Sequence, residues 1–220
     1  MNRAKRVGVR VKPSEIAGLA AYPAALQLFR DHIDMQFADI RVMMRFPMKP
    51  DFPEGFNLAA ASRLMEMVSG LSVVLYNDPD PNTPPATSPE QRGPRFRHLL
   101  TDCWPHDPTV DPPKDVIVET LYYFTRNSLT HALGLRQPGE PQILIAKDTL
   151  TPQQIERLER EPALPEFVPG RPVQVMGLNV YRLDVRALYW ATYWLMENVI
   201  GNPAHMNQAE HAIANGTWVP

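Results

Sequence analysis

The chain has 220 residues, of which 44% are hydrophobic and 21% are charged, a composition typical of a globular protein. Its formal net charge of -2 excludes a nonspecific polyanion-binding coat, so a nucleic acid would have to be held by a local patch. The single cysteine excludes an intramolecular disulfide framework. The basic amino terminus lacks the apolar run of a secretory signal, and no stretch has the uninterrupted apolar length of a membrane span, so we expect a cytoplasmic protein.

Two strong helices are predicted at the start of the chain. An apolar spacing of three and four residues over Pro23–Phe46 predicts a long amphipathic helix, with a buried face formed by Leu26, Phe29, Ile33, Phe37, Ile40 and Met44. A second helix is expected over Leu58–Tyr76, with Asn57 as its N-cap. We expect these two helices to begin a bundle.

The 24 prolines form two clusters, at Asn77–Pro94 and at Trp104–Asp115. Proline has no backbone N–H donor and clashes with the preceding helical turn, so both clusters are predicted as loops. A short helix with Phe96, Leu99 and Leu100 is expected between them. A fourth helix should begin near Asp111 or the following prolines and end near Gly134, with an inward stripe of Ile117, Leu121, Phe124, Ser128, His131 and Leu135.

The pattern changes after Pro138. The segments QILIA and VQVMGLNVYRL predict strands, and Thr151 to Gln154 form a capping box that opens a small helix. Asp184 is expected to cap the helix that follows it. We therefore predict a mainly α fold, a helical bundle with a small β hairpin or sheet near its C-terminal half. It would be one domain, 1–220, with a bundle core at 20–135, an α/β elaboration at 136–184, a helix packing back at 185–200 and a peripheral tail at 201–220.

The fourth predicted helix carries Arg126, Asn127 and His131 in an otherwise apolar segment. Asn127 and His131 are four residues apart and lie nearly above one another on a helix, whereas Arg126 lies about 140° from His131 around the axis. Two facing copies of the helix would bring two arginines and two histidines into one cleft. Arginine matches phosphate oxygens, and histidine exchanges a proton near neutral pH. This combination suits the cleavage of RNA.

Arg126 and Asn127, followed by three residues and His131 late in a helical bundle, resemble the signature of HEPN-fold proteins. Many of these proteins are metal-independent endoribonucleases of toxin–antitoxin and defence systems. The resemblance covers about Pro23–Leu135. It implies that His131 acts as general base or acid on the ribose 2'-hydroxyl and the leaving oxygen, that Arg126 holds the phosphate, and that Asn127 orients the histidine or the phosphate. The products would carry a 2',3'-cyclic phosphate and a 5'-hydroxyl.

The same resemblance implies RNA as substrate, a homodimer, and neither metal nor cofactor. Some family members have a tyrosine two residues after the histidine, which a partner nucleotidyltransferase modifies, but this chain has Leu133 there. That type of antitoxin is therefore not implied, and an antitoxin of another kind stays unidentified.

Other residues allow two interpretations each. The basic run at Arg92, Arg95 and Arg97 would guide RNA, or be a solvated helix start. Cys103 and His106 would form a nucleophile and base or half of a zinc site, although no second ligand pair completes such a site. The aromatic band would stack bases or, more simply, pack in the helical core or at a dimer interface; it comprises Tyr189, Trp190, Tyr193 and Trp194.

A non-catalytic function keeps the same fold. His131 would then be a satisfied core residue, and Arg126 would pair with Glu119 or cap a neighbouring helix. Such a protein would be a nucleotide-binding or dimeric regulatory module, or a structural subunit of a larger complex. Access of solvent to His131 separates it from an enzyme.

Overall fold

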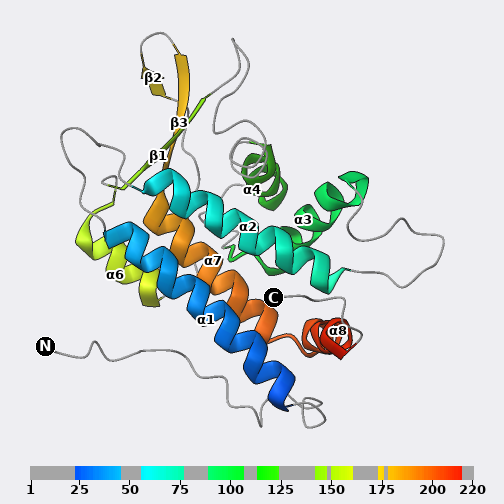
Figure 1. The fold of residues 1–220 in the computed structure, drawn as a ribbon. Helices are drawn as coiled ribbons and strands as arrows, with labels where there is room; N and C mark the ends of the chain where they lie inside the picture. The colour runs from blue at the N-terminus through cyan, green and yellow to red at the C-terminus, as the bar shows by residue number, and fades with distance from the viewer. Residues whose placement is uncertain are drawn as a thin grey trace, which may run out of the picture.

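A computed structural model describes residues 23–45, 56–76, 89–106, 113–123, 142–147, 150–160, 173–175 and 178–214. These residues are mainly helical, with one small sheet, as the sequence predicted for the fold class (Figure 1). The elements in chain order are α1 (Pro23–Arg45), α2 (Asn57–Leu75), α3 (Pro89–Cys103), α4 (Lys114–Thr120), β1 (Gln142–Ala146), α6 (Pro152–Arg160), β2 (Val173–Val175), β3 (Leu178–Asp184), α7 (Val185–Ile200) and α8 (Pro203–Ala214).

Helix α2 is the centre of the bundle and packs against α1, α3, α7 and α8 (Figure 1). Ala60 and Ala61 are completely buried, which lets neighbouring helices approach closely. By length and composition α2 would be apolar enough to cross a membrane, but 56% of that window is buried inside the bundle. The apolar character of α2 is therefore accounted for by core packing.

Helices α1 and α7 pack against each other through buried side chains. Of the predicted inward face of α1, Phe29, Ile33, Phe37 and Ile40 are buried and Met44 is partly buried, while the side chain of Leu26 lies outside the described part. Phe37 of α1 meets Tyr189 and Tyr193 of α7 edge to face, with ring centroids 5.2 Å and 5.6 Å apart. Trp194 donates a hydrogen bond from its Nε1 to the carbonyl oxygen of Leu158, and this bond joins α7 to α6. The aromatic band is thus part of the packing between helices, as the core interpretation expected.

The sheet has the strand order β1-β3-β2. β1 pairs in parallel with β3, from Gln142 opposite Val180 to Ala146 opposite Asp184. β2 pairs with β3 as the antiparallel neighbour. Parallel strands need a crossover connection, and the segment between β1 and β3 contains α6. The predicted strands are confirmed.

Two predicted helix starts are confirmed by their hydrogen bonds. The Thr151 backbone N–H donates to Gln154 Oε1 at 2.8 Å, and the Gln154 N–H donates to Thr151 Oγ1 at 3.3 Å, which is a reciprocal capping box. The Asp184 carboxylate accepts from the Arg186 backbone N–H at 2.8 Å and also binds the Arg186 guanidinium. The strand-to-helix corner between β3 and α7 is fixed by this cap.

Three predictions differ from the structure. Asn57 is the first residue of α2 rather than its cap, and Phe56 precedes it without a side-chain cap. Helix α3 begins at Pro89 and continues through Pro94, so the predicted loop Asn77–Pro94 is wrong over its last part. The first turn of a helix has no partner for its N–H groups, which accounts for Pro89 at the first position; Pro94 lies inside the helix. The segment expected as a peripheral tail contains α8, which buries Met206 and Ala209 against the bundle.

Candidate functional site

The three residues of the predicted catalytic motif, Arg126, Asn127 and His131, lie outside the described residues, which end at Tyr123 in this part of the chain. What the structure describes is the segment that leads to them. Ile117 and Val118 of α4 and Leu121 after it are buried. The Leu121 N–H donates to the carbonyl oxygens of Ile117 and Val118, where α4 passes into a π-helical turn over residues 121–123. Arg126 follows this anchored turn by three residues.

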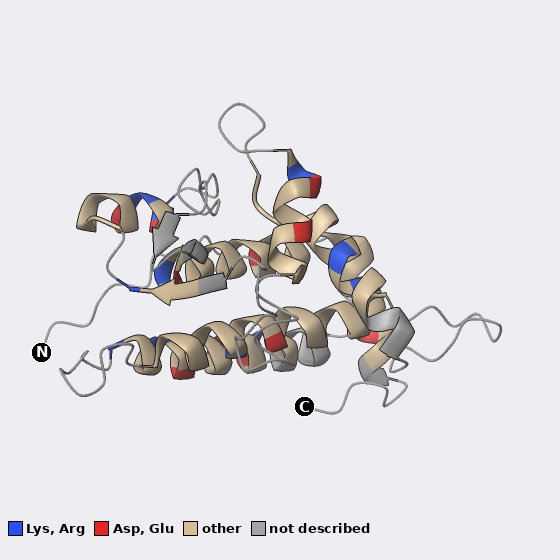
Figure 2. Ribbon diagram, turned by 90° about the horizontal axis from the view of Figure 1, so that it is seen from above, with Lys and Arg blue, Asp and Glu red and all other residues tan. Residues whose placement is uncertain are grey.

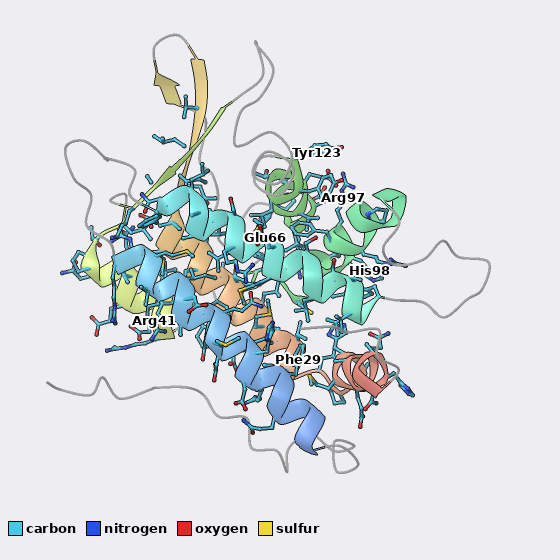
Figure 3. All side chains as sticks on the ribbon, in the orientation of Figure 1. Phe29, Arg41, Glu66, Arg97, His98 and Tyr123 are labelled. Carbon is cyan, nitrogen blue, oxygen red and sulfur yellow. The ribbon has the colours of Figure 1, made fainter. Side chains whose placement is uncertain are left out.

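Arg97 of α3 joins this turn to the bundle. Its Nε donates to Glu119 Oε1 at 2.7 Å and its Nη2 to Glu119 Oε2 at 3.2 Å, a bidentate pair. The guanidinium carbon lies 3.6 Å from the centre of the Tyr122 ring and 5.3 Å from that of Tyr123. Figure 3 shows Arg97 beside Tyr123 at the end of α4. We call Arg97, Glu119, Tyr122 and Tyr123 the α3–α4 clamp.

Gly93 allows the close approach on which the clamp depends. It lies one turn before Arg97 on α3, and a Cβ at this position would be 2.6 Å from the Tyr122 hydroxyl. A larger side chain would displace the Tyr122 ring. The clamp therefore has a backbone requirement in addition to its ion pair.

The three arginines predicted to guide RNA have different surroundings. The side chain of Arg92 lies outside the described part of the chain. Arg95 is 6% exposed, and Arg97 binds Glu119 in the clamp. An RNA phosphate would have to displace these contacts to reach either guanidinium, so the RNA-guiding role of the three arginines stays a prediction. Figure 2 shows acidic and basic residues interspersed along the described helices.

The clamp predicts a measurable contribution to stability. Arg97→Ala is expected to lower the free energy of unfolding by about 1 kcal/mol, because a half-exposed ion pair contributes roughly 0–1 kcal/mol and the ring contact about 0.5–1 kcal/mol. Urea unfolding is the measurement. The control is Arg63→Ala, which removes a more exposed pair with Glu66 and should cost less. Equal losses in the two variants, with weaker RNA binding only in Arg97→Ala, would instead support the RNA-guiding role.

A second group of polar residues lies where α2, α3 and α8 meet. The Tyr76 hydroxyl donates to Asp102 Oδ2 at 2.7 Å and lies 3.3 Å from His205 Nε2, and Cys103 Sγ lies 3.5 Å from His205 Nδ1. Because the tyrosine proton is given to Asp102, His205 fits as the tautomer that donates from Nε2 and accepts the thiol proton at Nδ1. Every donor then has an acceptor. We call Tyr76, Asp102, Cys103 and His205 the His205 chain.

The His205 chain is built from neutral groups at its inner end. Burial raises the pKa of the Cys103 thiol to about 12, with the Asp102 charge adding to the effect. Burial also lowers the pKa of His205 below its ordinary value. A protonated, 3% exposed thiol is a poor nucleophile, so the geometry supports a structural junction rather than thiol catalysis. Asn198 strengthens the junction by donating to the Cys103 carbonyl oxygen at 2.8 Å.

The partner of Cys103 is His205, from the segment expected to be peripheral, and not the predicted His106. Nothing in the local sequence indicates this contact, because 102 residues separate Cys103 from His205. The exposed edge of the junction carries His98, which stacks on Tyr76 with centroids 4.4 Å apart and pairs with Asp102. Within the described ranges, no group of three or more His, Cys, Asp or Glu side chains is arranged to hold a metal ion.

Comparison with known proteins gives no relative: no family model matches the chain, and neither a curated protein nor a solved structure shows significant similarity to it.

Proposed function

We propose that the chain is a HEPN-like, metal-independent endoribonuclease that acts as a homodimer in the cytoplasm. The observation that carries the proposal is the sequence pattern of Arg126, Asn127 and His131, which begins six residues after the last residue of α4 in a chain whose described part is mainly helical. The buried α4 and the α3–α4 clamp support it, because they fix the start of the segment that carries the motif. Such enzymes act as toxins or in defence, and the antitoxin that would accompany this one is not identified.

The proposed reaction is an attack of the ribose 2'-hydroxyl on the adjacent phosphorus. One His131 takes the proton from the hydroxyl. One of the two His131 side chains in the shared cleft gives a proton to the 5'-oxygen as its bond to phosphorus breaks. Arg126 holds the phosphate and offsets the negative charge that develops on the phosphate oxygens. Asn127 orients His131 or the phosphate. The products are a 2',3'-cyclic phosphate end and a 5'-hydroxyl end.

The outward face of α4 supports a shared cleft. Val116 is 48% exposed and Tyr123 is 45% exposed. Val116 belongs to α4 and Tyr123 to the turn that follows it, so exposed apolar side chains are present at both ends of this segment. A second copy of the segment would cover these side chains and bring the two motifs together.

A non-catalytic, nucleotide-binding or dimeric regulatory module is the second candidate. The surroundings of two arginines favour this candidate, because Arg95 is buried and Arg97 is bound to Glu119. Fewer arginines are then available to hold a long RNA backbone. This module would bind a nucleotide through Arg126 and His131 without cleaving RNA.

The test is incubation of the purified protein with mixed RNA in the presence and absence of EDTA. We expect equal cleavage in both, with 2',3'-cyclic phosphate ends, because histidine and arginine supply the proton transfer and the charge. RNA without protein is the control. Activity that EDTA abolishes and one divalent ion restores would contradict the proposal, and nucleotide binding without cleavage would favour the second candidate.

A further inference from the structure

The outward face of α1 carries large apolar side chains in solvent. Val42 is 69% exposed and Met35 is 55% exposed, the two highest values among the exposed large hydrophobic residues of the described chain. At 100° per residue, Met35, Ala38 and Val42 fall within a sector of about 60°. The opposite side of the helix is formed by buried Phe29, Ile33, Phe37 and Ile40. The helix therefore has a buried apolar face and, on its outer side, a second and narrower apolar stripe. Figure 1 shows α1 along the outside of the bundle.

Opposite charges stand at the two ends of this stripe. Asp31 precedes Ala38 by seven residues and Arg45 follows it by seven, and both are exposed. They are separated by about 21 Å along the axis, which is too far for an ion pair within one helix. Gln27 donates to Asp31 Oδ1 but does not neutralise its charge. The stripe thus has the acidic Asp31 at one end, the small Ala38 in the middle and the basic Arg45 at the other end.

We propose that the α1 face, formed by Asp31, Met35, Ala38, Val42 and Arg45, is an interface between two copies of this chain. The two α1 helices would lie antiparallel, with the two-fold axis beside Ala38. This arrangement places Asp31 near the partner's Arg45 and Met35 against the partner's Val42, and it repeats both contacts by symmetry. The small Ala38 lets the helices approach where they cross. A second copy fits because the face is complementary to itself.

The surroundings of the face are held in place by the chain itself. Arg41, at the edge of the stripe, donates to the Tyr189 hydroxyl from Nη2 at 2.8 Å and from Nε at 3.2 Å, so its guanidinium is turned toward α7. The buried face of α1 packs on α2, α7 and α8. The stripe is therefore presented on a fixed helix, which lowers the entropy lost on association.

The α1 face shares no residue with the Arg126 to His131 motif. Helix α4, which leads to the motif, packs on α3, whereas α1 packs on other helices. Association through α1 and RNA cleavage are therefore measured separately. If both the α1 face and the proposed motif interface form, the full assembly is a tetramer.

The first experiment is sedimentation of the full-length chain over a range of concentrations. We expect Val42→Asp to weaken association by about tenfold or more, because it places a charge in the centre of an apolar contact. The matched control is Leu58→Asp on α2, where the side chain is 45% exposed and does not belong to the α1 face, and its mass should equal that of the wild type. The same mass for Val42→Asp and the wild type at every concentration would overturn the proposal.

The charge pairing gives a sharper test. Asp31→Arg and Arg45→Asp should each weaken association, and the double variant should restore it, because both contacts then form with reversed signs. Failure of the double variant to recover the wild-type mass would exclude the antiparallel register.

Cross-linking tests the position of the two-fold axis. Ala38→Cys is expected to form a disulfide-linked dimer under mild oxidation, since Cα atoms across the axis would come within the range of a disulfide. The native Cys103 is 3% exposed and should not react. Asn207→Cys, at an exposed position on α8, is the control and should remain unlinked. Equal linking in both variants, or none in Ala38→Cys, would place the axis elsewhere and overturn the proposal.

Discussion

His131→Ala is expected to reduce RNA cleavage by about 10²–10⁴-fold, because the proposed mechanism loses its proton-transfer group. The fold should be retained, since one side chain is shortened without the introduction of a charge. The measurement is the rate of cleavage of a labelled RNA at saturating protein, together with the circular dichroism spectrum of the variant.

The control for this prediction is His211→Ala. His211 is exposed on α8 and lies outside the motif, so its removal should leave the cleavage rate unchanged. A folded His131→Ala protein that cleaves at the wild-type rate would contradict the assignment of His131. Equal losses in the two variants would point to a general effect of histidine removal and not to the motif.

His205→Ala is expected to lower the free energy of unfolding by about 1–3 kcal/mol, the usual cost of leaving buried hydrogen-bonding groups without a partner. His205 is 6% exposed and lies between the Tyr76 hydroxyl and the Cys103 thiol. Removing it breaks the His205 chain in the middle and leaves a cavity between α2, α3 and α8. Urea unfolding at neutral pH measures the change. The variant His98→Ala removes an exposed histidine that contacts Tyr76 and Asp102 at the edge of the junction, and it should cost less. Equal losses would contradict the central role of His205.

The same residue predicts sensitivity to acid. Burial lowers the pKa of His205 from its ordinary value of 6.5, with the nearby His98 acting in the same direction and Asp102 opposing both. The unfolded chain therefore binds the proton more readily than the folded chain. The contribution of neutral His205 to the free energy of unfolding should be fully present above about pH 6.5, and it should be lost as the pH decreases through and below that value. In His205→Gln, which cannot titrate, this loss should be smaller; an identical pH dependence in both proteins would refute the assignment.

The parts of the fold that the sequence predicts are those determined by local patterns. The apolar spacing of α1, the capping box at Thr151 and the cap at Asp184 each depend on residues a few positions apart, and all three are present in the structure. The extent of α3 does not follow from the proline pattern, because a cluster of prolines predicts a loop although Pro89 begins this helix.

Contacts between distant parts of the chain were not predictable in this way. The pairing of Arg97 with Glu119 joins two helices across a proline-rich segment, and no local period indicates it. The contact of His205 with Cys103 depends on the path of the whole bundle. The sequence suggested a site at Arg126 and His131, and the interactions that hold the neighbouring α4 in place emerged only from the three-dimensional arrangement.

The position of His205 has a consequence for synthesis. Tyr76 and His205 are separated by 129 residues, so a nascent chain synthesised only as far as β3 already contains α2 and α3 but lacks α7 and α8. At that stage the Cys103 thiol and the Tyr76 hydroxyl have no imidazole between them, and the apolar surfaces of α1 and α2 that α7 and α8 will cover are open to water. Closing these long loops is entropically costly and comes late. The bundle therefore completes its core only after α8 has left the ribosome, and until then the partly made chain exposes apolar surface on which chaperones can act.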